Sequence, residues 1–182
     1  MNVEILKHPT AEDWRLCKKL TLMTVWKDSD KEPTDEWKVK LLKANHSPIR
    51  TLQFCFRITD VPYWVSTHLV RHVHATPFVS TQRNDRQSMY NRNEAPQGAL
   101  VNMGWYMNAE ELITIAHKRL CRQASTETRE LIQALCNEVI KVNPEFTELL
   151  VPMCEYRGGL CDEFNCCGYN QTLNVLNNAK QN

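Results

Sequence analysis

Arginine, histidine and hydroxyl side chains are gathered in residues 70–86, which read VRHVHATPFVSTQRNDR. Arginine binds phosphate and carboxylate groups through paired hydrogen bonds, and neighbouring hydroxyls and amides can fix the orientation of such a ligand. Any one arginine is more typical of a solvated surface, but their clustering favours a nucleotide site. The arginines in or near segments with Asn, Gln, Ser or Thr are Arg71, Arg83, Arg86, Arg92, Arg119 and Arg122.

A helix expected over residues 108–123 adds a polar edge to these candidates. At about 100° per residue, Asn108 and Arg119 are nearly eclipsed and lie roughly 16 Å apart along the axis. Gln123 follows about one turn later on nearly the same side. Such an edge can bind an extended ligand. The alternative makes Asn108 a helix cap and Arg119 a surface residue, and the sequence leaves both open.

Two pairs of histidines have spacings that occur in metal sites. His68 and His72 are four residues apart, and His72 and His74 are two apart. The residues between the first pair are LVR, however, and lack the glutamate that accompanies zinc-protease chemistry. We therefore expect no metal at these histidines.

Cysteines are frequent, with eight in the chain. Four of them, separated by gaps of six, four and no residues, are Cys154, Cys161, Cys166 and Cys167. This spacing differs from the CxxC pairs that predict zinc. We expect no metal and reduced structural thiols, with a thiolate metal site as the alternative.

The composition predicts one domain over residues 1–182, with a Cys-rich tail from about residue 150. At 182 residues and 42% hydrophobic content the chain can bury one ordinary core. A net charge of +1 gives no overall attraction to nucleic acid or to an anionic membrane. The start, MNVEILKHPT, lacks the pattern of a secretory signal, so a cytoplasmic location is expected. Dinucleotide-binding, P-loop and serine-hydrolase motifs are absent from the sequence.

Strand and helix signals together predict an α+β fold. Residues 51–59, TLQFCFRIT, alternate strictly between apolar and polar or smaller side chains, as a half-buried strand does. Thr10 with Asp13 predicts a capped helix through about Thr24, and residues 33–44 predict a second short helix. A helix over residues 61–72 would place His68, Arg71 and His72 on one face.

Two longer helices are expected in the second half of the chain. The first covers residues 108–124, and its predicted buried stripe consists of Ala109, Leu112, Ile113, Ala116 and Leu120. The second begins at a Ser125 cap and ends before Pro144. Residues 77–107 indicate irregular chain with one short strand in FVSTQR, and the tail indicates a loop.

The order of these motifs resembles the flavin-dependent thymidylate synthases over roughly residues 1–145. The matching segments are HSPIR at 46–50, the alternating strand, RHVHATPFVSTQR at 71–83, and NAEELITIAHKRLCRQASTETRE at 108–130. The chain departs from the family pattern where Val73 replaces an arginine, Thr81 a serine, Asn84 a tyrosine and Glu110 an arginine; His68 stands where the family has glutamine. These changes bear most on flavin binding.

The resemblance implies a central antiparallel sheet flanked by helices and a homotetramer whose sites are shared between chains. It implies FAD as cofactor, dUMP as substrate, and methylenetetrahydrofolate and NADPH as co-substrates, with no nucleic acid or membrane partner. The implied flavin contacts are His46, Ser47, Arg71, His72 and Asn108. The implied nucleotide contacts are His68, Thr81, Arg83, Arg92, Arg119 and Gln123, and Arg119 is the implied catalytic residue because it would face the pyrimidine.

The implied reaction methylates carbon 5 of dUMP to give dTMP. The cofactors carry the chemistry, and the protein positions and polarises the pyrimidine. Two alternatives remain open at this point. One is a pyrimidine deoxynucleotide hydroxymethylase with a changed use of flavin, and the other is a nucleotide- or metal-binding module without catalysis. The tail, for which the family gives no guidance, could also cover the active site of a neighbouring subunit.

Overall fold

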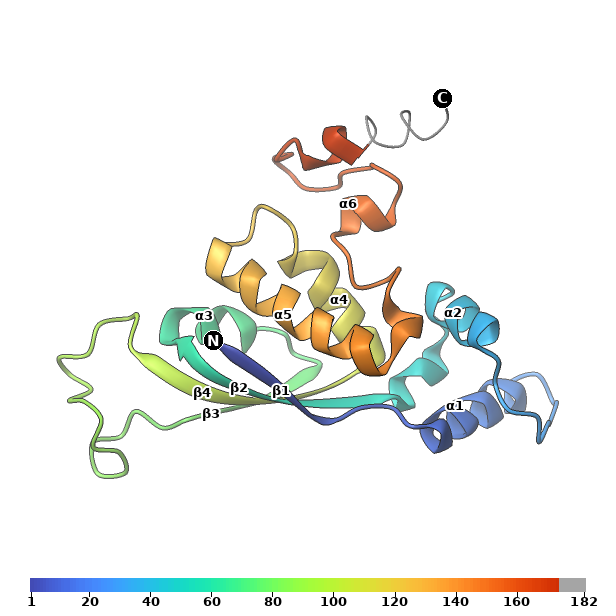
Figure 1. Ribbon diagram of the computed structural model, residues 1–182, viewed down its shortest axis with the longest axis horizontal. Coiled ribbons are helices and arrows are strands. Elements are labelled where there is room, and N and C mark those ends of the chain that lie inside the picture. The colour runs from blue at the N-terminus through green and yellow to red at the C-terminus, as the bar shows by residue number, and fades with distance from the viewer. Residues whose placement is uncertain (174–182) are drawn as a thin grey trace.

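A four-stranded antiparallel sheet forms the centre of the computed structural model, which describes residues 1–173. The strand order is β1–β2–β4–β3, with β1 at Asn2–Lys7, β2 at Gln53–Pro62, β3 at Ala75–Val79 and β4 at Leu100–Asn108. Helices α4 (Ala109–Arg119) and α5 (Thr126–Val142) lie over one face of the sheet, and α3 (Tyr63–Leu69) packs against β2 and β4 (Figure 1). The predicted α+β class with an antiparallel sheet is confirmed.

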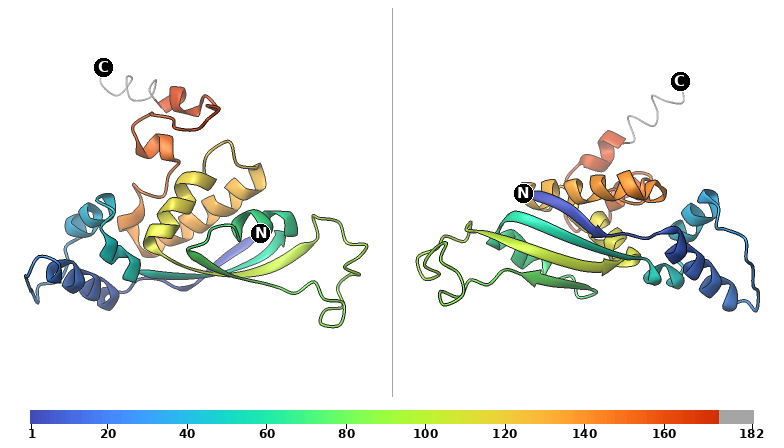
Figure 2. Two further views of the ribbon diagram at one scale, coloured as in Figure 1. Left: turned by 180° about the vertical axis from the view of Figure 1, so that it is seen from behind. Right: turned by 60° about the horizontal axis from the view of Figure 1, so that its bottom comes forward.

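The remaining elements lie at one end of the sheet and above α4. Helices α1 (Ala11–Met23) and α2 (Asp35–Lys43) and the 3-10 turn η1 (Ser47–Thr51) gather at one end, as both views in Figure 2 show. After α5, the 3-10 turn η2 (Pro144–Phe146) leads to the short helix α6 (Met153–Tyr156) and the tail. Residues 174–182 of the predicted tail lie outside the described residues, and the single-domain assignment stays a prediction.

Alternating side chains attach the sheet to these helices. Phe54, Phe56 and Ile58 of β2 are fully buried, as their alternation predicted. In β4, buried side chains also alternate, at Val101, Met103, Trp105 and Met107. The β4 region was expected to be irregular and β1 was not predicted, so the sheet has two strands more than expected.

The caps predicted at Thr10 and Ser125 are confirmed, and α2 has a cap that was not predicted. Thr10 and Asp13 form a capping box at α1, Thr34 caps α2, and Ser125 caps α5. The predicted buried stripe of α4 is confirmed, because all five of its residues are buried. Each cap accepts a hydrogen bond from a backbone N–H that has no partner inside the helix.

Three predicted boundaries in the site region are wrong. Helix α3 ends at Leu69, so Arg71 and His72 lie in the following turn and do not share a helical face with His68. Helix α4 ends at Arg119, which places Gln123 in a turn and not on the helix. Strand β3 begins at Ala75 and ends before the serine and threonine of FVSTQR.

Among the described residues, no helix is long and apolar enough to cross a membrane.

Candidate functional site

Three side chains from two segments meet along α4. His72, in the turn after α3, contacts Glu111 in the first turn of α4 through Nδ1, with 3.2 Å to Oε1. On its other side, Arg119 donates from Nε to Nε2 of His72 at 2.9 Å. Glu111 and Arg119 are eight positions apart, or roughly 12 Å along the helix axis. The His72 ring contacts both residues because the long Arg119 side chain can extend back toward the N-terminus of α4, the direction in which helical side chains tilt.

The hydrogen bonds determine the protonation of His72. A guanidinium only donates, so Nε2 of His72 must accept and carries no proton. Nδ1 therefore carries the ring proton, and this N–H donates a hydrogen bond to the Glu111 carboxylate. The His72–Glu111 contact is thus a hydrogen bond of a neutral ring and not an ion pair.

Burial also favours the neutral state of the His72 ring. The side chains of His72 and Glu111 are 11% and 7% exposed. Burial, together with the Arg119 charge, lowers the pKa of His72 from 6.5 to about 4. Burial also raises the pKa of the Glu111 carboxyl. A neutral imidazole between a guanidinium and a buried carboxyl holds Arg119 in place and adds no second positive charge.

Arg119 borders an open cavity at the end of α4. The cavity has a volume of about 240 Å³, and its lining residues are His72, Lys118, Arg119, Cys121, Gln123, Ala124 and Glu163. Within the described chain, Arg119 makes two hydrogen bonds, to His72 and to the His68 carbonyl at 3.4 Å. Three of its five N–H donors are left for a ligand such as a phosphate, a carboxylate or a pyrimidine carbonyl.

Arg71, His68 and Gln123 lie around this cluster. Arg71 is exposed, and its charge, after burial, contributes to lowering the pKa of Arg119. His68 is exposed at the end of α3 and lies edge-on to Trp64, with 5.7 Å between ring centroids. Gln123 lines the cavity and donates to the Asn165 carbonyl of the tail. The structure therefore brings these three predicted residues together with His72 and Arg119.

A second group of predicted residues lies at the opposite end of α4. Asn108 is both the last residue of β4 and the N-cap of α4, where its Oδ1 accepts from the Glu111 N–H at 2.9 Å. His46 and Ser47 are exposed at the start of η1. The structure thus supports the capping role that the sequence left open for Asn108. Its contact with a flavin stays a prediction.

Glu110, which stands where the family has an arginine, connects α4 to η1. Its carboxylate accepts from Nε of Arg50 at 2.5 Å. Arg50 belongs to η1 and Glu110 to the first turn of α4. The other replaced arginine, at Val73, leaves an apolar side chain that is 84% exposed.

Thr81, Arg83 and Arg92 do not join the cavity within one chain. They lie in the long segment 80–99, which projects beyond the sheet at the left of Figure 1. Arg83 there donates to both carboxylate oxygens of Asp85, at 2.9 and 2.5 Å. Their nucleotide contacts remain predictions that require another copy of the chain.

Glu111 is the site residue that sequence reasoning missed. It lies on the side of α4 opposite the predicted stripe, a position that usually faces solvent. In the structure α4 is buried on several sides, including Glu111, Ile115 and His117. The turn that carries His72 packs against this side of α4 and buries the carboxyl, which the periodicity of α4 alone does not indicate.

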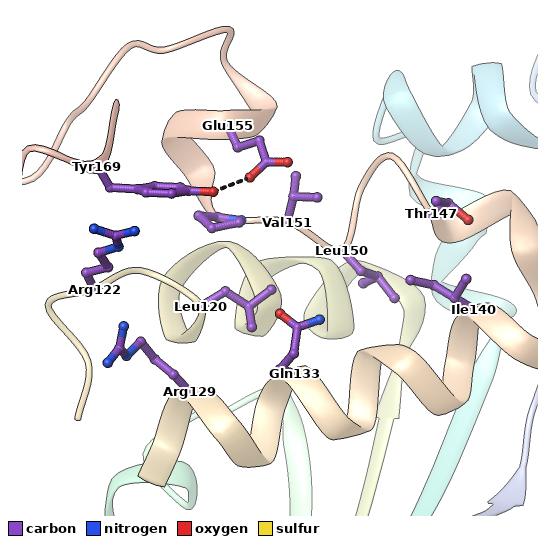
Figure 3. Close-up of a pocket in the computed structure, with 11 residues that line it drawn as sticks. Leu120, Arg122, Arg129, Gln133, Ile140, Thr147, Leu150, Val151, Glu155 and Tyr169 are labelled. Carbon is purple, nitrogen blue, oxygen red and sulfur yellow. Dashed lines mark hydrogen bonds between the residues drawn. The ribbon is translucent and has the colours of Figure 1, made fainter. Parts of the chain in front are cut away.

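A larger cavity of about 420 Å³ lies between α5, the end of α4 and the tail (Figure 3). The Arg122 guanidinium lies 4.4 Å from the Tyr169 ring centroid, and the Tyr169 hydroxyl donates to Glu155 at 3.0 Å. Arg129 and Gln133 of α5 line the opposite wall. These contacts attach the tail to the end of α4 through Arg122, one of the arginines considered for the nucleotide site.

Residues 85–145 match the sequence pattern of the family described as thymidylate synthase complementing protein. This segment includes Arg92, Asn108, Glu111, Arg119 and Gln123. The resemblance to the flavin-dependent thymidylate synthases is thereby confirmed. A comparison with curated proteins finds no match.

Solved structures of the flavin-dependent thymidylate synthases share this fold. A structure of thymidylate synthase X from Helicobacter pylori with FAD and dUMP is 13% identical, with a TM-score of 0.60 over 75% of this chain and 92% of that one. A second structure of that enzyme, also with FAD and dUMP, is 14% identical, with a TM-score of 0.64 over 82% of this chain and 98% of that one. At this identity the likeness shows the fold, and the chain spans almost the whole length of the matched enzyme.

Proposed function

We propose that this chain methylates dUMP at carbon 5 to give dTMP, with FAD as cofactor and methylenetetrahydrofolate and NADPH as co-substrates. The observation that carries the proposal is the Glu111–His72–Arg119 chain, which presents a guanidinium to a cavity at the end of α4. Glu111 and Arg119 belong to the segment that matches the family. The fold shared with an enzyme solved with FAD and dUMP supports it. A cytoplasmic location remains part of the proposal.

The exposed charges fit anionic ligands. Arg71 and Arg119 lie close enough for their positive charges to repel each other. A phosphate or pyrophosphate group between them would remove this repulsion, and both guanidiniums suit phosphate. His72, by contrast, uses both ring nitrogens within the chain. Only its ring face is left for the proposed flavin contact.

Arg119 is the residue that we propose acts on the pyrimidine. When bound, the reduced flavin supplies the hydride for this chemistry. Arg119 would donate to a pyrimidine carbonyl and stabilise the negative charge that develops there, a contribution of about 3 kcal/mol for one well-placed donor. His72 and Glu111 are positioning residues, because they hold the guanidinium in one orientation before the ligand arrives.

The site would be completed by other copies of the chain in a homotetramer. The cavity of about 240 Å³ is smaller than the roughly 300–1,000 Å³ of pockets that enclose drug-sized ligands. His46 and Ser47 lie near the opposite end of α4, and Arg83 and Arg92 lie on the projecting segment. Symmetric assembly would bring these separated segments together at every site.

Product analysis of the full chain tests the proposal. The protein is incubated with dUMP, methylenetetrahydrofolate, NADPH and FAD, and the nucleotide is identified by mass spectrometry. We expect dTMP, loss of the activity in Arg119→Ala, and retention in Arg15→Ala, a matched exposed arginine on α1. Absence of both turnover and dUMP binding would overturn the proposal.

One observation favours a second candidate, the pyrimidine hydroxymethylase. Two arginines that the family pattern places at the flavin are replaced here, by the exposed Val73 and by Glu110, whose carboxylate is paired with Arg50. A 5-hydroxymethyl product formed without flavin would identify this activity. Flavin absorbance of the purified protein separates the two candidates before any assay.

A further inference from the structure

Four thiols from three separate segments surround one small cavity beside the tail. Its lining includes Cys121 from the turn after α4, Cys154 from α6, and Cys161 and Cys167 from the tail. The cavity volume is about 10 Å³, which is close to the space that one water molecule fills. The thiols are therefore grouped around a space of atomic size.

Backbone geometry in the tail produces this grouping. Gly158 and Gly159 have φ values of +64° and +100°, in the left-handed region that glycine adopts without strain. They reverse the chain just after α6, with the Gly159 N–H donating to the Cys154 carbonyl at 2.7 Å. Gly168, at φ +81°, turns the chain again directly after Cys167. These turns return the tail thiols toward α6.

The carboxylates beside the cavity are already paired. Asp162 accepts from Arg157, and Glu163 lies 3.5 Å from the Lys118 ammonium. The groups that remain to face the cavity are therefore mainly soft sulfur ligands. Sulfur ligands of this kind select zinc over hard cations such as magnesium and calcium.

We propose that Cys121, Cys154, Cys161 and Cys167 form a structural zinc site that fixes the tail to the end of α4. As the side chains stand, the described residues contain no group of three or more His, Cys, Asp or Glu arranged to hold a metal. Zinc–sulfur bonds of about 2.3 Å require the four sulfurs to move inward into the cavity. Binding would release the thiol protons and supply the positive charge that the thiolates lack.

This set differs from the four cysteines considered in the sequence, where a thiolate metal site was the alternative to reduced structural thiols. Cys166 does not line the cavity, and its thiol donates to Asn170 at 3.0 Å. Cys121, 33 positions before Cys154, takes its place. Of the adjacent cysteines Cys166 and Cys167, whose spacing differs from zinc motifs, only Cys167 is therefore a proposed ligand. A metal would order a segment with little apolar contact of its own, where Phe164 is fully exposed.

Elemental analysis of the full chain, purified without chelator, tests the site. We expect about one zinc per chain, and at least a tenfold loss of zinc in Cys121→Ser and Cys154→Ser. Cys166→Ser is the matched control, because it changes a tail thiol outside the cavity, and it should retain the metal. Circular dichroism of each variant checks that the fold is intact.

Cobalt substitution of the wild-type chain gives a readout that needs no variant. The stripped protein loaded with Co²⁺ should show the intense visible bands of tetrahedral thiolate coordination. Less than a tenth of a zinc per chain together with no such bands would overturn the proposal. It would also be overturned by equal zinc in Cys121→Ser, by iron in place of zinc, or by an intact mass that shows these thiols joined as disulfides.

Discussion

The Nε–H of Arg119 donates to Nε2 of His72 at 2.9 Å, so the orientation of the guanidinium beside the cavity depends on a neutral histidine. The two residues are 47 positions apart and come from different elements. Glu111 fixes the histidine from the other side. This dependence leads to predictions on affinity, on pH and on assembly.

Replacing His72 should weaken nucleotide binding through Arg119, because both ring nitrogens of His72 make hydrogen bonds within the chain. His72→Asn removes the acceptor that holds Arg119, and we expect dUMP affinity to fall about 5- to 30-fold, or about 1 to 2 kcal/mol. Isothermal titration with dUMP measures the change. His74→Ala, an exposed histidine two residues away, is the control. Equal affinities in wild type and His72→Asn would contradict the positioning role.

The lowered pKa of His72 predicts a loss of stability in acid. Between pH 6.5 and about 4 the unfolded chain binds a proton at His72 and the native chain does not, so the free energy of unfolding falls as the pH falls. The full shift corresponds to at most about 3 kcal/mol. Burial of His117 acts in the same direction, whereas the raised pKa of Glu111 acts in the opposite one.

Urea unfolding at pH 7 and pH 5 measures this effect. His72→Asn should lose less stability on acidification than the wild type, because only the wild type must keep that ring neutral. The same loss in both proteins would show that other groups carry the pH dependence.

Arg83 and Arg119, two of the three arginines assigned to the nucleotide, should each contribute to its affinity. Arg83→Ala and Arg119→Ala should each weaken dUMP binding by about 1.5 to 3 kcal/mol, or roughly 10- to 150-fold. Arg86→Ala, in the same exposed segment as Arg83, serves as the control. Unchanged affinity in both variants, with folding intact, would refute the assignment.

Mixing these two variants tests whether sites are shared between chains. Arg83 and Arg119 are not brought together within one chain, so we propose that each site takes them from different copies. Co-folded Arg83→Ala and Arg119→Ala chains should then regain activity that neither has alone, because some sites receive both intact arginines. Light scattering should show a tetramer. A monomer, or no regain of activity, would count against shared sites.

The core at Phe146 gives a stability prediction independent of function. Phe146 is fully buried and lies edge-on to Phe54, with 5.4 Å between ring centroids. Phe146→Ala should lower the free energy of unfolding by about 3 to 5 kcal/mol, through lost burial and the cavity left behind. Phe164→Ala, at a fully exposed position, should change it by less than about 0.5 kcal/mol. Urea unfolding compares them.

Local periodicity explains which parts of the fold were predictable. The alternation of β2 and the stripe of α4 depend on neighbours in sequence, and both were predicted. Strand β4 has the same alternation, at Val101, Met103, Trp105 and Met107, but it follows a long polar segment and contains Gly104. Strand β1 is an edge strand with only Val3 and Ile5 partly buried, so its pattern is weak.

The site was predictable only as far as residue type reveals it. Arg119 stood out as a group suited to phosphate or a pyrimidine carbonyl and His72 as an implied flavin contact, and the structure joins the two residues. The neutral state of His72 and the burial of Glu111 depend on tertiary packing around α4, which no local pattern contains. Cys121 likewise became part of the thiol group only because the tail folds back on the end of α4.

Asn108 belongs to β4 and caps α4, so no loop separates the strand from the helix. A slip of β4 by one residue against β2 would turn its four buried side chains to the opposite face of the sheet. The same slip would displace Glu111 and Arg119 together, away from a histidine held by another element. Strand registration and ligand recognition are therefore one cooperative event. A chain with a misaligned sheet would lack the proposed nucleotide site, and so would be distinguishable from a correctly folded one by a binding measurement.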